Sequence, residues 1–201
     1  MVLYKTIVAD PPWKVSAGRS LRGYAKRNGK QVFNVADDRA RQLSYPALSV
    51  AQIKGLSVSS LAATDAHLYL WTINRYLRDA FDVAAAWGFV FSTLLTWAKN
   101  PIGGGLGGDA FGISTEFCLF CRRGNLPAQE RMKTTWFNWK RPYKNGYPQH
   151  SAKPDGFFSL VEQISPSPRI ELFSRKNRCG WDGWGDECPA SVEIGIDKFP
   201  A

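Results

Sequence analysis

The chain lacks long hydrophobic runs and is poor in cysteine and histidine. No apolar run among its 201 residues reaches the roughly 18 residues that a membrane-spanning helix needs. The N-terminus shows no charged segment followed by an apolar core, so no signal peptide is visible. Four cysteines in a chain of this length favour reduced thiols over a disulfide framework. We therefore expect a cytoplasmic protein that makes no membrane contact.

Acidic residues are also in the minority. Lys and Arg number 26 against 17 Asp and Glu, which gives a formal net charge of +9. A surplus of this size lowers the electrostatic cost of approaching a polyanion and speeds the encounter. Charge alone leaves a second interpretation open, namely a soluble protein that happens to be basic.

The positive charge is concentrated in two stretches. Residues 14–31 carry six cations and no acid, and residues 131–147 interleave five cations with five aromatic rings. Cations bind phosphates, and flat rings stack on unpaired bases. We predict that both stretches contact nucleic acid, with a solvated surface as the alternative. The substrate-binding cations predicted in the first stretch are Arg19, Arg22, Lys26 and Arg27.

The spacing of apolar residues predicts strands that alternate with helices. The expected strands are 2–9, 67–72, 89–97, 114–122 and 169–174, and the expected helices are 49–61, 75–87 and 154–164. A long loop is expected before residue 45 and a polar tail after residue 174. This alternation implies an α/β fold, with one sheet covered by helices on both faces. No repeat or shift in composition divides the chain, so residues 1–201 are expected to form one domain.

The most specific segment is Asp10-Pro11-Pro12-Trp13, at the carboxyl end of the first expected strand. Ligands of open α/β sheets bind at that edge. Two consecutive prolines remove two N–H donors, so the turn offers carbonyl oxygens and the Asp10 carboxylate. Hydrogen bonds from an amino group to Asp10 and to the Pro11 carbonyl would turn its lone pair toward an electrophile. Trp13 offers a ring for stacking a flipped base, and the alternative is a rigid turn with a core tryptophan.

Further motifs follow in a fixed order. Tyr45, Leu70-Trp71, 96–99 and Glu116 come first, and 150–155, 169–175 and 180–187 come after them. Together with Asp-Pro-Pro-Trp, this ordered set resembles the MT-A70 family of N6-adenine methyltransferases. The resemblance implies a Rossmann-like, S-adenosylmethionine-dependent methyltransferase fold with a single mixed sheet. It also implies a permuted order, in which the catalytic strand precedes the cofactor-binding strand.

The resemblance also implies cofactor-binding roles. Pro154 suits a first helical turn, so Lys153 is expected at the helix cap, where it would hold the α-carboxylate of the cofactor. Glu171 and Arg175 are placed against the ribose, with a strand-end ion pair as the alternative. Asn177 follows on the connecting loop, as does Arg178, where polar groups could bind hydroxyls.

Four residues receive roles near the two reactants. Asp186 and Glu187 match a polar pair of the family near the adenosine of the cofactor, although asparagine is more usual at the first position. Asp10 is expected beside the positively charged methionine end of the cofactor. Tyr45 resembles a family tyrosine near the target base, with a core or loop tyrosine as the alternative.

The implied reaction is a direct transfer of a methyl group from a sulfonium to N6 of adenine. The site has to orient the weakly nucleophilic amine and accept its proton, and no metal is expected. Cys118 and Cys121 have C-x-x-C spacing, but in a strand their side chains point to opposite faces, which disfavours zinc.

We predict DNA as the substrate, because the chain is little more than a catalytic core. An RNA N6-adenosine methyltransferase of the same family and a catalytically silent nucleic-acid-binding subunit are the alternatives. A homodimer or a second, recognition subunit would be the protein partner. Otherwise, sequence specificity would come from the loops at 14–44 and 127–149.

Overall fold

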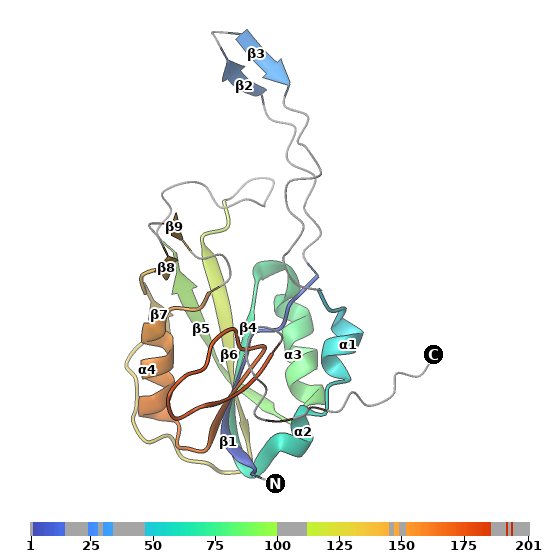
Figure 1. Ribbon diagram of the computed structural model, residues 1–201, viewed down its shortest axis with the longest axis vertical. Helices are drawn as coiled ribbons and strands as arrows, with labels where there is room; N and C mark the ends of the chain where they lie inside the picture. The colour runs from blue at the N-terminus through green and yellow to red at the C-terminus, as the bar shows by residue number, and fades with distance from the viewer. Residues whose placement is uncertain are drawn as a thin grey trace.

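The structure is a computed structural model, and it describes residues 2–14, 24–27, 30–33, 47–99, 112–144, 147–148, 152–185, 192 and 194. Within these residues a seven-stranded sheet has the order β11-β10-β1-β4-β6-β5-β7 (Figure 1). Its strands are β1 (Tyr4–Ala9), β4 (Ala62–Thr72), β5 (Val90–Ala98), β6 (Thr115–Arg123), β7 (Trp136–Phe137), β10 (Arg169–Leu172) and β11 (Asp182–Trp184).

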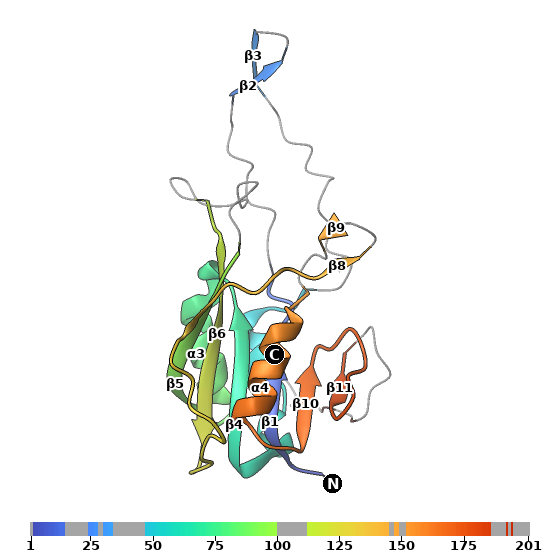
Figure 2. The ribbon, with the colours of Figure 1, turned by 90° about the vertical axis from the view of Figure 1, so that its left-hand side faces the viewer.

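The sheet is mixed. Strands β11, β10, β1 and β4 are parallel, and β6 runs antiparallel to both β4 and β5 (Figure 2). Since β5 therefore runs in the same direction as β1, the carboxyl ends of these strands lie at one edge of the sheet. Strands β1 and β10 are neighbours although they come from opposite ends of the chain.

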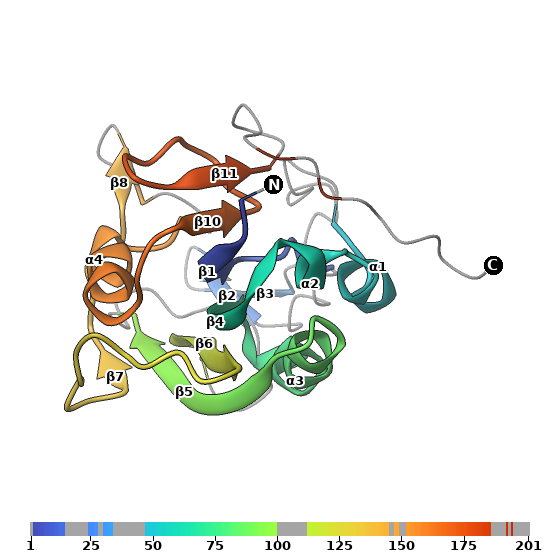
Figure 3. The same cartoon turned by 90° about the horizontal axis from the view of Figure 1, so that it is seen from below.

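Helices cover both faces, as the sequence predicted. On one face lie α1 (Val50–Lys54), α2 (Val58–Leu61) and α3 (Leu77–Ala86), with the short 3-10 helix η1 (Asn74–Tyr76) before α3, and on the other lies α4 (Asp155–Ile164) (Figure 3). The period of two along each strand separates the two cores. In β4, Leu68 and Leu70 pack with the helices of the first face, while Tyr69 and Trp71 pack against α4.

The structure differs from the predicted elements at several places. Strand β4 begins at Ala62, before the strand expected at 67–72, and β7 lies in the loop expected at 127–149. The single helix expected at 49–61 is two short helices, because a capping box starts α1 at Ser49 and Gly55 ends it. The loop expected before residue 45 contains the antiparallel pair β2 (Tyr24–Arg27) and β3 (Lys30–Phe33), so that expectation was wrong there. The expected polar tail contains β11, whose three residues are too few to show a period.

A second small antiparallel pair, β8 (Tyr143–Lys144) and β9 (Tyr147–Pro148), lies at the end of the basic and aromatic stretch that begins at residue 131.

No helix in the described part of the chain is both long enough and apolar enough to cross a bilayer.

Candidate active site

Asp10 lies at the carboxyl edge of the sheet, immediately after β1. The register pairs Ala9 with Leu70 of β4 on one side and with Leu172 of β10 on the other. Asp10 is therefore flanked by the last residues of β4 and by the residue that follows β10, at the edge where open α/β sheets bind their ligands.

The Pro-Pro turn is held by its own backbone. The Trp13 N–H donates to the Pro11 carbonyl at 2.8 Å, and the Leu48 N–H donates to the Pro12 carbonyl at 2.9 Å. A carbonyl oxygen has two lone pairs, so the Pro11 oxygen retains one for a further donor.

Trp13 itself is buried. Its side chain is 5% exposed, its indole N–H donates to the Trp71 carbonyl at 3.0 Å, and its ring stacks on Tyr76 with centroids 5.2 Å apart. This geometry favours the core tryptophan over a stacking platform for a base. The indole fixes the turn to the end of β4.

Four charged side chains of alternating sign meet beside Asp10. The Lys153 ammonium lies 2.5 Å from Oδ2 of Asp10 and 3.5 Å from Oε2 of Glu116. Oε1 of Glu116 accepts a hydrogen bond from Lys99. Exposed fractions of 9% for Lys153, 14% for Glu116 and 18% for Lys99 show that these ions are largely withdrawn from water. Such ions are stable in a protein only when they are paired.

Burial and pairing shift the pKa values of this cluster in different directions. Burial raises the pKa of Asp10, and the Lys153 ammonium opposes the rise without cancelling it. Burial acts to lower the pKa of Lys153, but the carboxylates of Asp10 and Glu116 outweigh it and the net shift is upward. Burial acts to raise the pKa of Glu116, but Lys153 and Lys99 outweigh it and the net shift is downward. Asp10 is thus the more basic of the two carboxylates.

Lys153 lies one residue earlier than the sequence predicted. Pro154 occupies the N-cap of α4 with an extended ψ of 141°, rather than the first helical turn, so Lys153 precedes the cap. Its backbone is outside the helix, and its side chain reaches Asp10 across the sheet edge. The structure thus brings Lys153 and Asp10 together, a contact that the sequence did not predict and that the helix cap does not provide.

The end of β10 carries a second polar group of residues. Burial raises the pKa of Glu171 to about 7, with the charge of Arg178 opposing the rise. Oε2 of Glu171 and Nε of Arg178 are 4.0 Å apart, and both are buried without a hydrogen-bond partner in the described part of the chain. Phe173, which follows the strand, has a φ of +61°, a conformation that side chains rarely adopt outside functional turns. Unsatisfied buried polar atoms beside a strained turn fit a site for the hydroxyl groups of a nucleoside.

The structure describes the other predicted site residues only in part. Arg175 acts electrostatically on Asp10 and lowers its pKa, and Asn177 is exposed on the loop after β10. Arg19, Arg22, Tyr45, Asp186 and Glu187 lie outside the described residues, and for Lys26 and Arg27 only the backbone of β2 is described.

His67 is a structural residue. It is buried, with Nδ1 2.8 Å from the Ser165 hydroxyl and Nε2 3.0 Å from the Leu126 carbonyl oxygen.

The two cysteines of the C-x-x-C spacing lie in different cores. Cys118 packs in the core under α4 and Cys121 packs in the core on the other face, which confirms that the two thiols point to opposite faces.

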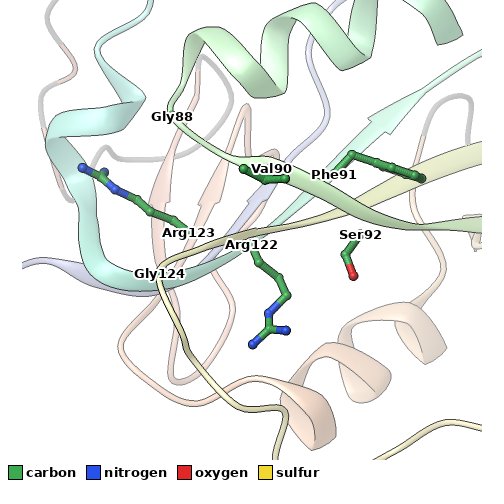
Figure 4. Close-up of a pocket in the computed structure, with 7 residues that line it drawn as sticks. All are labelled: Gly88, Val90, Phe91, Ser92, Arg122, Arg123 and Gly124. Atoms are coloured by element: carbon green, nitrogen blue, oxygen red, sulfur yellow. The ribbon is translucent and has the colours of Figure 1, made fainter.

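A surface hollow of about 370 Å³ lies elsewhere, lined by residues of β5 and β6 that include Val90, Phe91 and Arg122 (Figure 4). Val90 begins β5 and Arg123 ends β6, so this hollow lies at the edge opposite Asp10. It is separate from the charged cluster.

The sheet, the turn after β1 and the lysine before α4 follow the order that the resemblance implied. The MT-A70 family model matches residues 4–187 of the chain. The chain belongs to the MT-A70 family. As a member of this methyltransferase family it combines a mixed seven-stranded sheet with a Rossmann-like fold, as the sequence predicted.

Relatives of this MT-A70 protein fall into two groups by coverage. The chain is 29% identical over 201 residues to the Type II methyltransferase M.MunI of Mycoplasma sp, covering 95% of this chain and 81% of that protein. It is 26% identical to a putative N(6)-adenosine-methyltransferase MT-A70-like protein of Medicago truncatula, covering 92% of this chain and 26% of that protein. The N(6)-adenosine-methyltransferase catalytic subunit METTL3 of Homo sapiens is 22% identical, with coverages of 86% and 26%. The chain thus spans about a quarter of these two eukaryotic proteins.

The structure also adds to the site a residue that was given no role from the sequence. Lys99 was noted only as part of the 96–99 motif, and its ion pair with Glu116 forms across two neighbouring strands. The sequence around a lysine at a strand end gives no sign of a partner on another strand. Only the pairing of β5 with β6 shows that Lys99 belongs to the site.

Proposed function

We propose that this protein transfers a methyl group from S-adenosylmethionine to N6 of adenine in DNA. The observation that carries the proposal is the Asp10 carboxylate, held by Lys153 in an acceptor-rich turn at the carboxyl edge of the sheet. An exocyclic amine has two protons to donate, and this turn offers acceptors with few competing donors.

The described residues fit the cofactor. Lys153 and Asp10 carry the charges that complement the carboxylate and the cationic methionine end, and Glu171 with Arg178 offers the unsatisfied atoms for ribose hydroxyls. Arg175 and Asn177 are proposed to complete this pocket, and Asp186 and Glu187 are proposed at its adenosine end. When bound, the cofactor supplies an electrophilic methyl group on a sulfonium.

The protein residues orient the amine and take its proton. One N–H donates to Asp10 and the other to the free lone pair of the Pro11 carbonyl, which directs the nitrogen lone pair away from both acceptors. Pro11 and Pro12 fix the acceptors before the substrate arrives. The raised pKa of Asp10 makes it the better proton acceptor as positive charge develops on the nitrogen. Lys153 keeps the carboxylate ionised and in place.

The relatives support DNA over RNA. The chain is 29% identical to the Type II methyltransferase, against 26% and 22% to the two N(6)-adenosine-methyltransferases. RNA is the second candidate, because those N(6)-adenosine-methyltransferases are also relatives. A silent binding subunit is disfavoured, since it would have no need of the Asp10 and Lys153 pair.

Further features of the proposal follow from the sequence. Residues 1–201 act as one catalytic domain in the cytoplasm. Arg19, Arg22, Lys26 and Arg27 bind the phosphate backbone, and Tyr45 lies near the target base. Specificity comes from the loops at 14–44 and 127–149, from a second copy of the chain, or from a recognition subunit.

The decisive experiment is methyl transfer from labelled S-adenosylmethionine to matched single- and double-stranded DNA and RNA. Asp10→Asn keeps the shape of the side chain but removes its charge, and we expect kcat to fall by about 100-fold or more. Asp82→Asn is the matched control, because Asp82 is an exposed residue of α3 paired with Lys54. N6-methyladenine that persists at the wild-type rate in Asp10→Asn would contradict the assignment, and the preferred polymer decides between DNA and RNA.

A further inference from the structure

Lys99 belongs to the charged cluster but is separated from Asp10 by Glu116 and Lys153. It follows β5, its ammonium bonds to Oε1 of Glu116 in β6, and the other oxygen of Glu116 faces Lys153. The backbone N–H of Lys99 donates to the Ser114 carbonyl at 2.7 Å, which ties the end of β5 to the start of β6. The order of charges is therefore Lys99, Glu116, Lys153 and Asp10.

Two indole rings fix the positions of the ammonium groups. The Lys99 nitrogen lies 4.8 Å from the centroid of the Trp97 ring, and the Lys153 nitrogen lies 5.2 Å from that of Trp71. The two rings contact each other edge to face, with centroids 6.1 Å apart. An ammonium held over an indole face gains cation–π attraction and loses freedom to follow a competing carboxylate.

The distances show which carboxylate holds Lys153. Its ammonium is 2.5 Å from Asp10 and 3.5 Å from Glu116, although both carboxylates are within reach. Glu116 already has a full positive charge on its other oxygen, which weakens its attraction for Lys153. Without Lys99, two carboxylates would share one ammonium in a poorly solvated site, and Glu116 would compete with Asp10 for it.

We propose that Lys99 is a positioning residue for methyl transfer: by neutralising Glu116, it leaves the Lys153 ammonium on Asp10. This inference rests on the proposed function of Asp10 as the group that receives the amine. Lys99 itself touches neither Asp10 nor the reacting atoms in this arrangement; it acts through Glu116.

The first test compares Lys99→Met with Lys99→Arg in the full chain, with Lys54→Met as control, because Lys54 forms an exposed pair with a single carboxylate. We expect Lys99→Met to lower kcat roughly 10-fold, with KM for nucleic acid changed about 2-fold or less. The acid limb of the kcat–pH profile of this variant should move to higher pH by about half a unit. The reason is that the Lys153 ammonium is then shared between Asp10 and Glu116, so it stabilises the Asp10 carboxylate less. Lys99→Arg and Lys54→Met should keep the wild-type limb.

A second variant separates electrostatics from folding. Lys99→Met combined with Glu116→Gln removes one charge of each sign, so the acid limb should return toward the wild-type position even if the rate stays low. The other groups that act electrostatically on the cluster are unchanged in all variants; they are Arg141, Cys118, Glu171 and Arg175. If Lys99→Met does not fold, Lys99→Gln takes its place.

A readout without substrate keeps the two proposals distinguishable. In protein labelled with ¹³C at the glutamate carboxyl carbon, the signal lost in Glu116→Gln identifies Glu116, and its titration should move to higher pH in Lys99→Met. If the Glu116 titration shifts in this way but the wild-type protein transfers no methyl group, the electrostatic coupling of Lys99 to Glu116 is supported and the proposed function is refuted. An active wild type whose Glu116 titration and acid limb are both unmoved by Lys99→Met would overturn the role of Lys99 and leave the function intact.

Discussion

At the scale of single residues, the site depends on carboxyl groups placed where water is scarce. Asp10 and Glu171 follow and end neighbouring parallel strands, and burial raises the pKa of both. Asp10 has a lysine at 2.5 Å, whereas Arg178 lies 4.0 Å from Glu171, and the Arg178 Nε has no hydrogen-bond partner among the described residues. In the proposed function the better-paired Asp10 binds the amine as a carboxylate, and the less well paired Glu171 binds hydroxyl groups.

Glu171 should leave a measurable pH dependence on stability. Its pKa is about 7 in the folded protein against an ordinary value of 4.5, so the unfolded chain releases the proton first as pH rises. Wild-type stability should therefore fall between pH 4.5 and 7 relative to Glu171→Gln, and stay level on either side of that window. We expect a relative loss of about 2 kcal/mol between pH 5 and pH 8.

Urea unfolding of both proteins at the two pH values measures this loss. Glu130→Gln, at an exposed glutamate, serves as the control and should run parallel to the wild type. Parallel behaviour of Glu171→Gln would mean that the Glu171 carboxyl is better solvated in the folded protein than its environment indicates.

At the scale of elements, the residues after β10 and β11, where we propose that the nucleoside of the cofactor binds, lie in close backbone contact. The Ser174 N–H donates to the Trp184 carbonyl at 3.0 Å, which brings the residue after β11 against the residues after β10. A Cβ on Gly185 would lie 2.3 Å from the Ser174 oxygen and 2.6 Å from its nitrogen. Only glycine fits at this close approach of two backbones.

Gly185→Ala should therefore destabilise the fold and weaken cofactor binding together. Because the obstructing atoms are backbone, the strands have to separate, and we expect a loss of about 2–3 kcal/mol in the free energy of unfolding. Gly180→Ala is the control: its φ of +75° is strained for alanine, but its Cβ would meet nothing within 4 Å. That variant should lose about 1 kcal/mol and bind cofactor normally. Denaturant unfolding and calorimetric titration measure the two effects, and equal losses in both variants would exclude the close-approach explanation.

At the scale of the whole molecule, the order of the strands assembles the site. Parallel pairing puts the ends of β4, β1 and β10 side by side, and the antiparallel β6 brings Glu116 to the same edge. Helix α4, packed on one face through Phe157 and Val161, presents Lys153 at that edge. The net charge of +9 acts over a longer range, by attracting a polyanion to the molecule.

The predicted phosphate contacts of the basic stretch can be tested through the salt dependence of nucleic-acid binding. Replacing Arg19, Arg22, Lys26 and Arg27 with glutamine should weaken binding to any nucleic acid sequence. It should also make the slope of log K against log salt shallower by up to about 3, if each cation neutralises one phosphate. Fluorescence anisotropy with a labelled oligonucleotide at several salt concentrations measures the slope. An unchanged slope would assign the phosphate contacts to other cations, such as those between 131 and 144.

The fold class and the ordered motifs could be predicted from the sequence alone. The continuous apolar runs of β1 and β4 and the helical spacing of α3 and α4 are local signals, because they depend only on neighbouring residues of the chain. Asp10 was predicted as a site residue from the composition of its turn, whereas the role of Lys153 was implied by the resemblance to the MT-A70 family.

Tertiary structure decided what local signals cannot contain. The pairing of Lys99 with Glu116, the burial of Trp13 against Tyr76 and the strand β11 all depend on segments that meet only when the sheet forms. The shift of Lys153 to a position before the N-cap depends on the backbone that Pro154 adopts. The sequence could thus propose candidate residues such as Asp10 and Lys153, but the direction and strength of their mutual interactions depend on distances across the sheet, which no spacing along the chain encodes.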